Sequence, residues 1–360
     1  MLQNDYDVIF ERVAQVANEY LVERSKEVET ARLLLPALLE PRIEDRDTAL
    51  SDPRYHSLEL VHLLLRRSCG LWLTEPLAAT KAASLAAQIA DRLPPPRYGS
   101  CAVEEARAQA WAYVGNSLRV LGELRPAAVA LRIAADHLVA AGCDPLLEAE
   151  LLSFTASLRD SEGEPAKALP LINRVQAIYR STGDRRLEAR ALISKGALLG
   201  NSGKYRSAIS WLCKALNLLD LENEPFLVLC AEHNLMTYLV HSGKPKKAQD
   251  LLKTKRSLYV DLAHWSVLLK LRWLDGSIAR HLGDLEAAES LFWLARDGFL
   301  EQGFELDAAV MALDIAEICR LQGRDSHAKR LTAEAIPVLE SYGAIRQAEA
   351  ARRFFAKVGG

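Results

Sequence analysis

The stretch GALLGNSGKYRSAISWLCKAL, residues 196–216, contains the pattern that decides the fold. Its Gly203 follows a run with apolar residues three and four apart, and a second amphipathic run follows the glycine. This arrangement predicts a helix of about 17 residues, a short turn whose glycine is left-handed, and a second helix. Equivalent glycines recur every 40 or 41 residues, at Gly122, Gly163, Gly203, Gly243, Gly283 and Gly323.

Two further series of small residues keep the same period. Glycines lie 20 residues after the first set at Gly142, Gly183, Gly303 and Gly343, and Asn223 and residues 261–263 take that place in the other two repeats. Alanines stand five residues after each turn glycine, at Ala127, Ala168, Ala208, Ala248, Ala288 and Ala328. We therefore expect six helical hairpins whose paired helices approach closely at these alanines.

The residues of the best copy resemble the tetratricopeptide repeat: Gly196, Gly203-Lys-Tyr205, Ala208, Leu212 and Ala215. The copies that begin at Gly115 and Gly276 match almost as well, and Trp111 stands where the family usually has a tryptophan. The other copies depart from the pattern, with Ala156, Met236 and Ala316 in place of the first glycine and Val175 and Lys255 in place of the late small residue. The period exceeds the family's usual 34 or so. The resemblance covers residues 104 to 357 and implies an all-α, right-handed superhelical solenoid of antiparallel helix hairpins.

Four segments follow from the pattern. Residues 1–54 are predicted as a helical segment, with Tyr6, Ile9, Val13, Val16 and Tyr20 on one face, followed by a polar loop. Residues 55–100 are predicted as a divergent hairpin, 101–343 as six repeats, and 344–360 as a capping helix. The loop PPPRYGS, residues 94–100, is either a break in the array or a rigid connection within it.

The glycines before Lys204 resemble a phosphate-binding loop, but the spacing excludes that interpretation. The loop requires a glycine where Leu198 stands and a serine or threonine where Tyr205 stands. The histidines show no metal-binding spacing, and the chain has neither a GxSxG nor an HExxH motif. We expect a protein that is not an enzyme and that has neither a cofactor nor a metal site.

Composition narrows the class of partner. The net charge of −2 does not favour nucleic acid, and no apolar run is long enough to cross a membrane. Six isolated cysteines are expected to be reduced and mostly buried, as in a cytoplasmic protein. The basic run at residues 244–256 is interpreted as a solvated outer face in preference to a patch for an anionic partner.

Family resemblance implies that the first helix of each repeat lines a concave peptide-binding groove. The predicted groove residues are Asn116, Arg119, Arg190, Asn201, His233, Thr237, His241, Lys270, Trp273, Ser277 and Arg280. Asparagines can bond a peptide backbone and the cations can pair with acidic groups, which favours a peptide or protein partner with acidic side chains. The predicted function is an interaction scaffold or adaptor. The alternatives are a peptide-responsive regulator and an unused hydrated surface, and the sequence predicts no oligomeric state.

Overall fold

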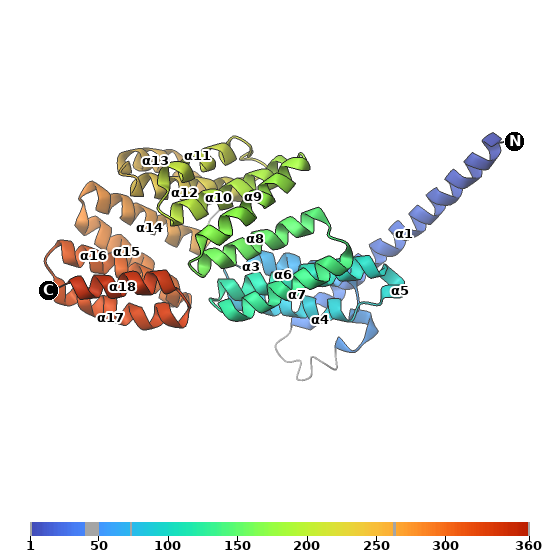
Figure 1. The fold of residues 1–360 in the computed structure, drawn as a ribbon, viewed down its shortest axis with the longest axis horizontal. Helices are drawn as coiled ribbons and strands as arrows, with labels where there is room; N and C mark the ends of the chain where they lie inside the picture. The colour runs from blue at the N-terminus through green and yellow to red at the C-terminus, as the bar shows by residue number, and fades with distance from the viewer. Residues whose placement is uncertain (1, 40–49, 73, 262–263, 359–360) are drawn as a thin grey trace. The chain divides into compact units, whose positions relative to one another are not determined.

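The structure is a computed structural model that describes residues 2–39, 50–72, 74–261 and 264–358 (Figure 1). Within these ranges all regular elements are helices, which confirms the predicted all-α class. The N-terminal helices are α1 (Leu2–Leu39), the 3-10 helix η1 (Pro53–Tyr55), α3 (Leu58–Leu71), α4 (Pro76–Asp91), α5 (Pro95–Tyr98), α6 (Ser100–Val120) and α7 (Leu124–Ala141). The later helices are α8 (Pro145–Ser161), α9 (Pro165–Ser181), α10 (Arg185–Asn201), α11 (Tyr205–Leu216), α12 (Pro225–His241), α13 (Pro245–Asp261), α14 (Trp265–Leu282), α15 (Leu285–Glu301), α16 (Glu305–Leu321), α17 (Asp325–Ser341) and α18 (Ile345–Lys357).

The chain forms two compact units. Unit 1 comprises residues 1–120 and 129–147, and unit 2 comprises residues 121–128 and 148–360. The sequence repeat predicts a different division, into segments 1–54, 55–100, 101–343 and 344–360. Because the two compact units reflect packing and not the repeat, they do not test these segments, which stay a prediction.

Unit 1 contains the divergent hairpin. Helix α3 packs against α4, α4 packs against α6, and α1 packs against α3. Direct packing of α4 on α6 makes the loop at 94–100, which contains α5, a connection within the array. The backbone of α1 is described, but the side chains of its predicted apolar face, Tyr6, Ile9, Val13, Val16 and Tyr20, are not, and residues 40–49 of the polar loop lie outside the described residues.

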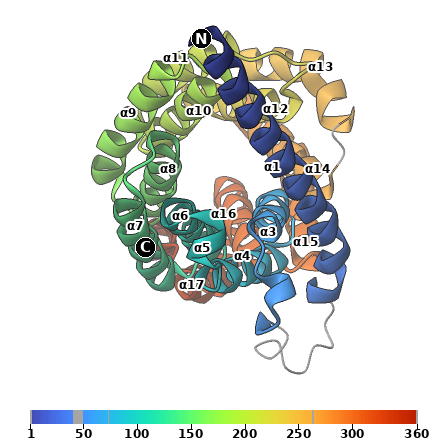
Figure 2. The same ribbon diagram turned by 90° about the vertical axis from the view of Figure 1, so that its right-hand side faces the viewer.

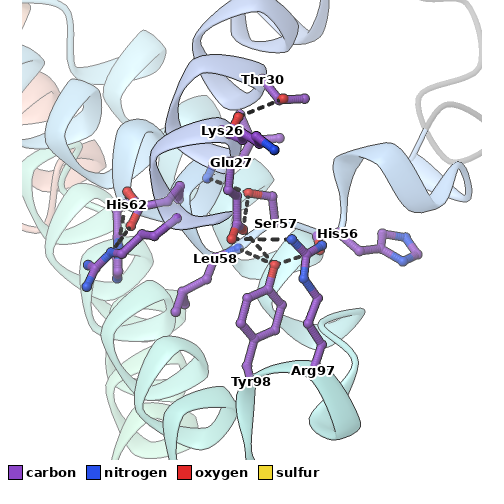
Figure 3. A network of polar contacts seen from close by, with 12 residues as sticks. Lys26, Glu27, Thr30, His56, Ser57, Leu58, His62, Arg97 and Tyr98 are labelled. Atoms are coloured by element: carbon purple, nitrogen blue, oxygen red, sulfur yellow. Dashed lines mark hydrogen bonds and ion pairs between the residues drawn. The ribbon is translucent and has the colours of Figure 1, made fainter. Parts of the chain in front are cut away.

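A half-buried carboxylate, that of Glu27, joins α1 to the rest of unit 1. Figure 3 shows Ser57, Tyr98 and Arg97 converging on Glu27. The Tyr98 hydroxyl donates to Glu27 Oε1 at 2.6 Å, the Ser57 hydroxyl donates to the same oxygen at 2.7 Å, and Arg97 pairs with Oε2 at 3.4 Å. Ser57 also caps α3. Burial opposes ionisation of Glu27, but these hydrogen bonds and the Arg97 charge hold its pKa below the ordinary value.

Unit 2 consists of stacked antiparallel hairpins, as predicted. Helices α10 and α11, α14 and α15, and α16 and α17 form hairpins, and α11 on α12 and α15 on α16 join successive ones. The turn glycines have positive φ, with +77° at Gly203, so their left-handed conformation is confirmed. The periodic alanines are 0% exposed, which confirms close packing: Ala127, Ala168, Ala208, Ala248, Ala288 and Ala328.

The helical glycines of the repeat mark where two helices approach most closely. A Cβ atom on Gly196 would lie 2.7 Å from Leu212 Cγ, and one on Gly276 would lie 2.6 Å from Phe292 Cε1. Both partners are fully buried large side chains on the second helix of the same hairpin. The family pattern of a small residue opposite a large one is therefore a packing requirement.

Successive helices of unit 2 follow an arc. Figure 2 shows α8, α10 and α12 on its inner side and α9, α11 and α13 on its outer side. The basic run therefore lies on the outer helix α13, as predicted, where Lys246 and Lys247 are exposed. Helix α11 ends at Leu216 after 12 residues, shorter than predicted, and a non-helical segment runs to Pro225.

The expectation of mostly buried cysteines is wrong. Cys69, Cys101, Cys143 and Cys213 are exposed, and only Cys319 is buried among the six. Cys143 stands in a turn, in the left-handed conformation at φ 62°. A search of the described helices found none with the length and apolar character needed to cross a membrane.

Candidate peptide-binding face

Helices α8, α10, α12, α14 and α16 are the first helices of the hairpins of unit 2, and several of their side chains contact one another across neighbouring helices. We call this set the first-helix face: Asp160, Arg190, Asn201, His233, Thr237, Tyr238, His241, Lys270, Trp273, Ser277, Arg280, His281, Asp307 and Asp314. Three of its hydrogen bonds join positions 41 apart. Asn201 Nδ2 donates to Asp160 Oδ2 at 3.0 Å, the Tyr238 hydroxyl donates to the Ala197 carbonyl at 3.1 Å, and Trp273 Nε1 donates to Asp314 Oδ2 at 2.9 Å.

Asn201 is engaged with its neighbours at both ends of its amide. Its Nδ2 donates to Asp160, and its Oδ1 accepts from the Tyr238 hydroxyl at 3.2 Å. Since the predicted role of Asn201 was to bond a peptide backbone, a peptide must exchange these bonds or use the lone pairs and the N–H that remain. The side chain is exposed, so that exchange is sterically open.

Aromatic rings form the next part of the face. The His241 ring stacks on Tyr205 with centroids 5.5 Å apart and meets His281 edge-on at 5.9 Å. Tyr205 also stacks on Tyr238 at 6.2 Å, so it links its hairpin to the following one. Loss of hydration, together with the charges of His281 and Arg280, lowers the pKa of His241 and favours its neutral form.

Lys270 lies among His233, Cys230 and Asp307, three side chains from two neighbouring helices. Burial and then the Lys270 charge lower the pKa of His233 to about 4, so His233 is neutral near pH 7. Its Nδ1 lies 3.3 Å from the Tyr259 hydroxyl. Burial raises the pKa of Asp307, and Lys270 opposes that shift. The structure thus brings the predicted residues His233 and Lys270 together.

Trp273 and Arg280 converge on Asp314. The Arg280 Nη1 atom lies 3.1 Å from Asp314 Oδ1, opposite the oxygen bonded by Trp273. Burial raises the pKa of Asp314, and Arg280 and Trp273 oppose the shift. The predicted cation Arg280 therefore has a carboxylate partner within the chain. Ser277, one turn earlier on α14, accepts a hydrogen bond at its carbonyl from His281 at 2.8 Å.

The remaining predicted residues differ in their surroundings. Arg190 on α10 is half-buried and forms no ion pair with the described residues, although its charge acts on the hydroxyl of Tyr179. Thr237 donates to the carbonyl of His233 within α12 at 2.9 Å. In unit 1, Asn116 is 4% exposed and its Oδ1 accepts two hydrogen bonds from Arg119, at 3.0 and 3.1 Å. Asn116 is thus a buried partner of Arg119.

Sequence reasoning did not select Tyr238, Asp307 or Asp314. The 40-residue period carries the lining positions of α14 to Val310, Leu313, Glu317 and Arg320 on α16. Three hydrogen bonds between first helices instead join residues one repeat plus one position apart, and one of them joins Asp314 to Trp273. This offset of one position, which comes from the stagger of adjacent helices, is the signal that would have identified Asp314 as the partner of Trp273.

We searched the described residues for groups of three or more histidine, cysteine, aspartate or glutamate side chains placed to hold a metal ion, and found none. No protein-family model matches the chain. No curated protein matches it in sequence.

Similar solved structures share the fold. A Rap protein complexed with competence and sporulation factor has a TM-score of 0.58 and 15% identity, over 79% of this chain and 78% of that one. The aspartyl phosphate phosphatase F from Bacillus subtilis has a TM-score of 0.59 and 14% identity, over 82% and 75%. The apo form of the quorum sensor NprR from B. thuringiensis has a TM-score of 0.52 and 12% identity, over 94% and 99%. At these identities the likeness concerns the fold, a tetratricopeptide-like helical solenoid.

Proposed function

We propose that this chain is a non-enzymatic interaction protein that binds a peptide or an extended segment of a partner protein on the first-helix face. The supporting observation is the continuous strip of polar and aromatic side chains across five successive first helices. Hydrogen bonds connect Asp160 to Asn201 and Asn201 to Tyr238, and the ring of Tyr205 on α11 stacks on both Tyr238 and His241. Such a strip presents donors, acceptors and rings at regular spacing, as recognition of an extended chain requires. A protein partner is favoured over nucleic acid by the net charge of −2.

Charge on this face is mixed, and that selects the partner. Arg280 is paired with Asp314, whereas Arg190 and Lys270 form no ion pair with the described residues. Both are half-buried, so a partner carboxylate would meet cations that are poorly hydrated. The ligand we propose carries acidic groups near Arg190 and Lys270 and neutral polar groups elsewhere. Asn116 and Arg119 stay a separate prediction for unit 1.

Selection from a phage-displayed library of random peptides tests this proposal. Peptides enriched on the wild-type chain should lose affinity for the double variant Arg190→Glu with Lys270→Glu. Each charge reversal removes one charge-assisted contact, and the pair should weaken binding by at least about tenfold. Acidic residues should be enriched among the selected peptides.

The chain offers a matched control on the outer helices. Lys246→Glu with Lys247→Glu makes the same charge change on exposed residues of α13. Selected peptides should bind this control as they bind the wild type. Equal binding to the wild type and both double variants would refute the assignment of the first-helix face.

A peptide-responsive regulator is the second candidate function, and one contact within unit 2 favours it. Arg346 on α18 forms an ion pair with Asp160 on α8, with 3.6 Å between Arg346 Nη2 and Asp160 Oδ1. The same side chain lies close to Gly163, since a Cβ atom added to that glycine would be 3.3 Å from Arg346 Nε. Asp160 Oδ1 and Arg346 Nη2 are buried and have no hydrogen-bond partner. The two side chains are 36% and 21% exposed, and an ion pair of this kind that forms no hydrogen bond contributes little to stability. Two of the similar structures are described as a factor complex and a quorum sensor.

Small-angle scattering separates the two functions. A scaffold keeps its radius of gyration when a selected peptide binds, whereas a regulator changes it. For a regulator, Arg346→Met should reproduce part of the change without peptide, because it removes the contact between α18 and α8. An unchanged radius in both experiments would eliminate the regulator and leave the scaffold.

A further inference from the structure

A pocket of about 270 Å³ lies in unit 2 between α15, α16 and α17. None of its lining residues belongs to the first-helix face. Four alanines form its floor, at Ala308, Ala309, Ala312 and Ala335, each between 2% and 7% exposed. Leu300 and Val338 extend the apolar wall. The pocket is therefore large enough for one long side chain and is apolar at its base.

Comparison with the preceding repeat shows a difference in side-chain length at this pocket. Forty residues earlier, α14 carries Leu268 and Arg272 at the positions that Ala308 and Ala312 occupy on α16. Both helices begin at equivalent residues, Trp265 and Glu305, so the positions correspond directly. The two side chains at these positions are therefore shorter on α16 than on α14, where Leu268 is half-buried and Arg272 is exposed.

Charge at the rim is negative. Glu334 is exposed and forms no ion pair with the described residues. Glu305 accepts a hydrogen bond from Tyr342. The cation at the rim, Arg296, is compensated, because Asp297 lies 3.3 Å from its Nη1 and the Trp293 ring lies 5.0 Å below it. An incoming cation would thus meet two carboxylates beside an apolar floor.

We propose that this pocket binds an arginine side chain of a partner protein. The methylene stem of the arginine would lie on the alanine methyl groups, and its guanidinium would pair with Glu334 at the rim. Arginine is favoured over lysine because its planar fork can meet a carboxylate through two hydrogen bonds. This site is independent of the first-helix face and takes ligand chemistry of the opposite charge.

Alanine-methyl NMR on the full chain tests the pocket directly. The probe is the blocked tripeptide acetyl-Gly-Arg-Gly-amide, and the controls replace its arginine with norleucine or glutamate. We expect saturable shifts of the methyl groups of Ala308, Ala312 and Ala335 with the arginine probe. The methyl group of Ala208, buried in another repeat, should not move. Absence of saturable shifts at millimolar probe, or equal shifts with norleucine, would overturn the proposal.

Two variants assign the contacts. Glu334→Gln keeps the shape of an exposed residue and should weaken the arginine probe about two- to fivefold, the range of an exposed ion pair. Ala312→Arg introduces the residue that the preceding repeat carries, and it should fill the pocket and abolish probe binding. Unchanged affinity in the folded Glu334→Gln variant would show that the carboxylate makes no contact, and retained binding in Ala312→Arg would place the probe elsewhere.

Discussion

Gly200→Ala tests the packing between first helices most severely. Gly200 lies on α10, and a Cβ atom there would be 2.1 Å from Tyr238 Cζ and 2.3 Å from Cε1 on α12. The Tyr238 ring is 5% exposed, and its hydroxyl donates to Ala197 and Asn201. The ring must therefore move, and its hydrogen bonds must lengthen or break.

The expected cost combines three effects. Alanine in a helix interior is ordinarily about 1 kcal/mol more favourable than glycine. Forcing a methyl group into a filled core costs about 1–3 kcal/mol, and each lost hydrogen bond costs about 1 kcal/mol. We expect the variant to lower the local free energy of unfolding by about 2–3 kcal/mol.

Native-state hydrogen exchange measured by mass spectrometry is the suitable assay, because a chain of two units does not unfold as one two-state domain. Amides of α10 and α12 should exchange faster in Gly200→Ala. The control is Gly70→Ala on α3, where no atom lies within 4 Å of the added Cβ, and it should be neutral or stabilising. Tyr238→Leu in the Gly200→Ala background should recover part of the loss. The packing argument is refuted if Gly200→Ala behaves like Gly70→Ala.

Three other perturbations follow from the structure. Glu27→Gln should raise hydrogen exchange in the second half of α1, and it should flatten the loss of unit 1 stability in acid, measured by unfolding at several pH values. The folded pKa of Glu27 lies below 4.5, so its carboxylate stabilises the fold above that pH. This contribution is lost as the pH falls through the lowered pKa. His233→Gln should remove a decline in stability between pH 6.5 and about 4, because the unfolded histidine binds a proton in that range and the folded one does not; an unchanged pH profile would contradict this. Ala248→Leu should destabilise unit 2 by about 1–3 kcal/mol by overpacking, whereas Ala166→Leu, exposed on α9, should change the thermal midpoint little.

The repeat was predictable from sequence because packing restricts residue size at every hairpin. Glycine at 203 and alanine at 208 are dictated by a left-handed turn and by a close helix contact, and both constraints recur at fixed spacing. The end of α11 at Leu216 was not predictable in this way, because its repeat has Asn223 where others have a turn glycine. Cysteine exposure also escaped prediction, since a thiol is small and weakly polar and no periodic constraint acts on it.

The first-helix face could be predicted only in part, since position along a helix was known but the stagger between helices was not. Residues His233, Lys270 and Arg280 were selected because first helices line one side. Two carboxylates were missed, Asp314, which contacts Trp273 and Arg280, and Asp307, on which the Lys270 charge acts, because their places depend on how α14 and α16 are staggered.

Under the proposed function, those missed carboxylates change the kind of ligand that the first-helix face would select. A row of three uncompensated cations, Arg190, Lys270 and Arg280, would attract any acidic chain, and its affinity would fall steeply with salt. With Arg280 held by Asp314, a carboxylate that approaches α14 gains most near Lys270 and is repelled close to Asp314. Arg190 lies on α10, two first helices before Lys270 on α14, and the exposed ring of His241 belongs to the intervening α12. A matching peptide therefore needs two separated acidic groups with an apolar or aromatic residue between them. Specificity for this order of groups comes from the paired Arg280 and Asp314 as much as from Arg190 and Lys270, which form no ion pair with the described residues.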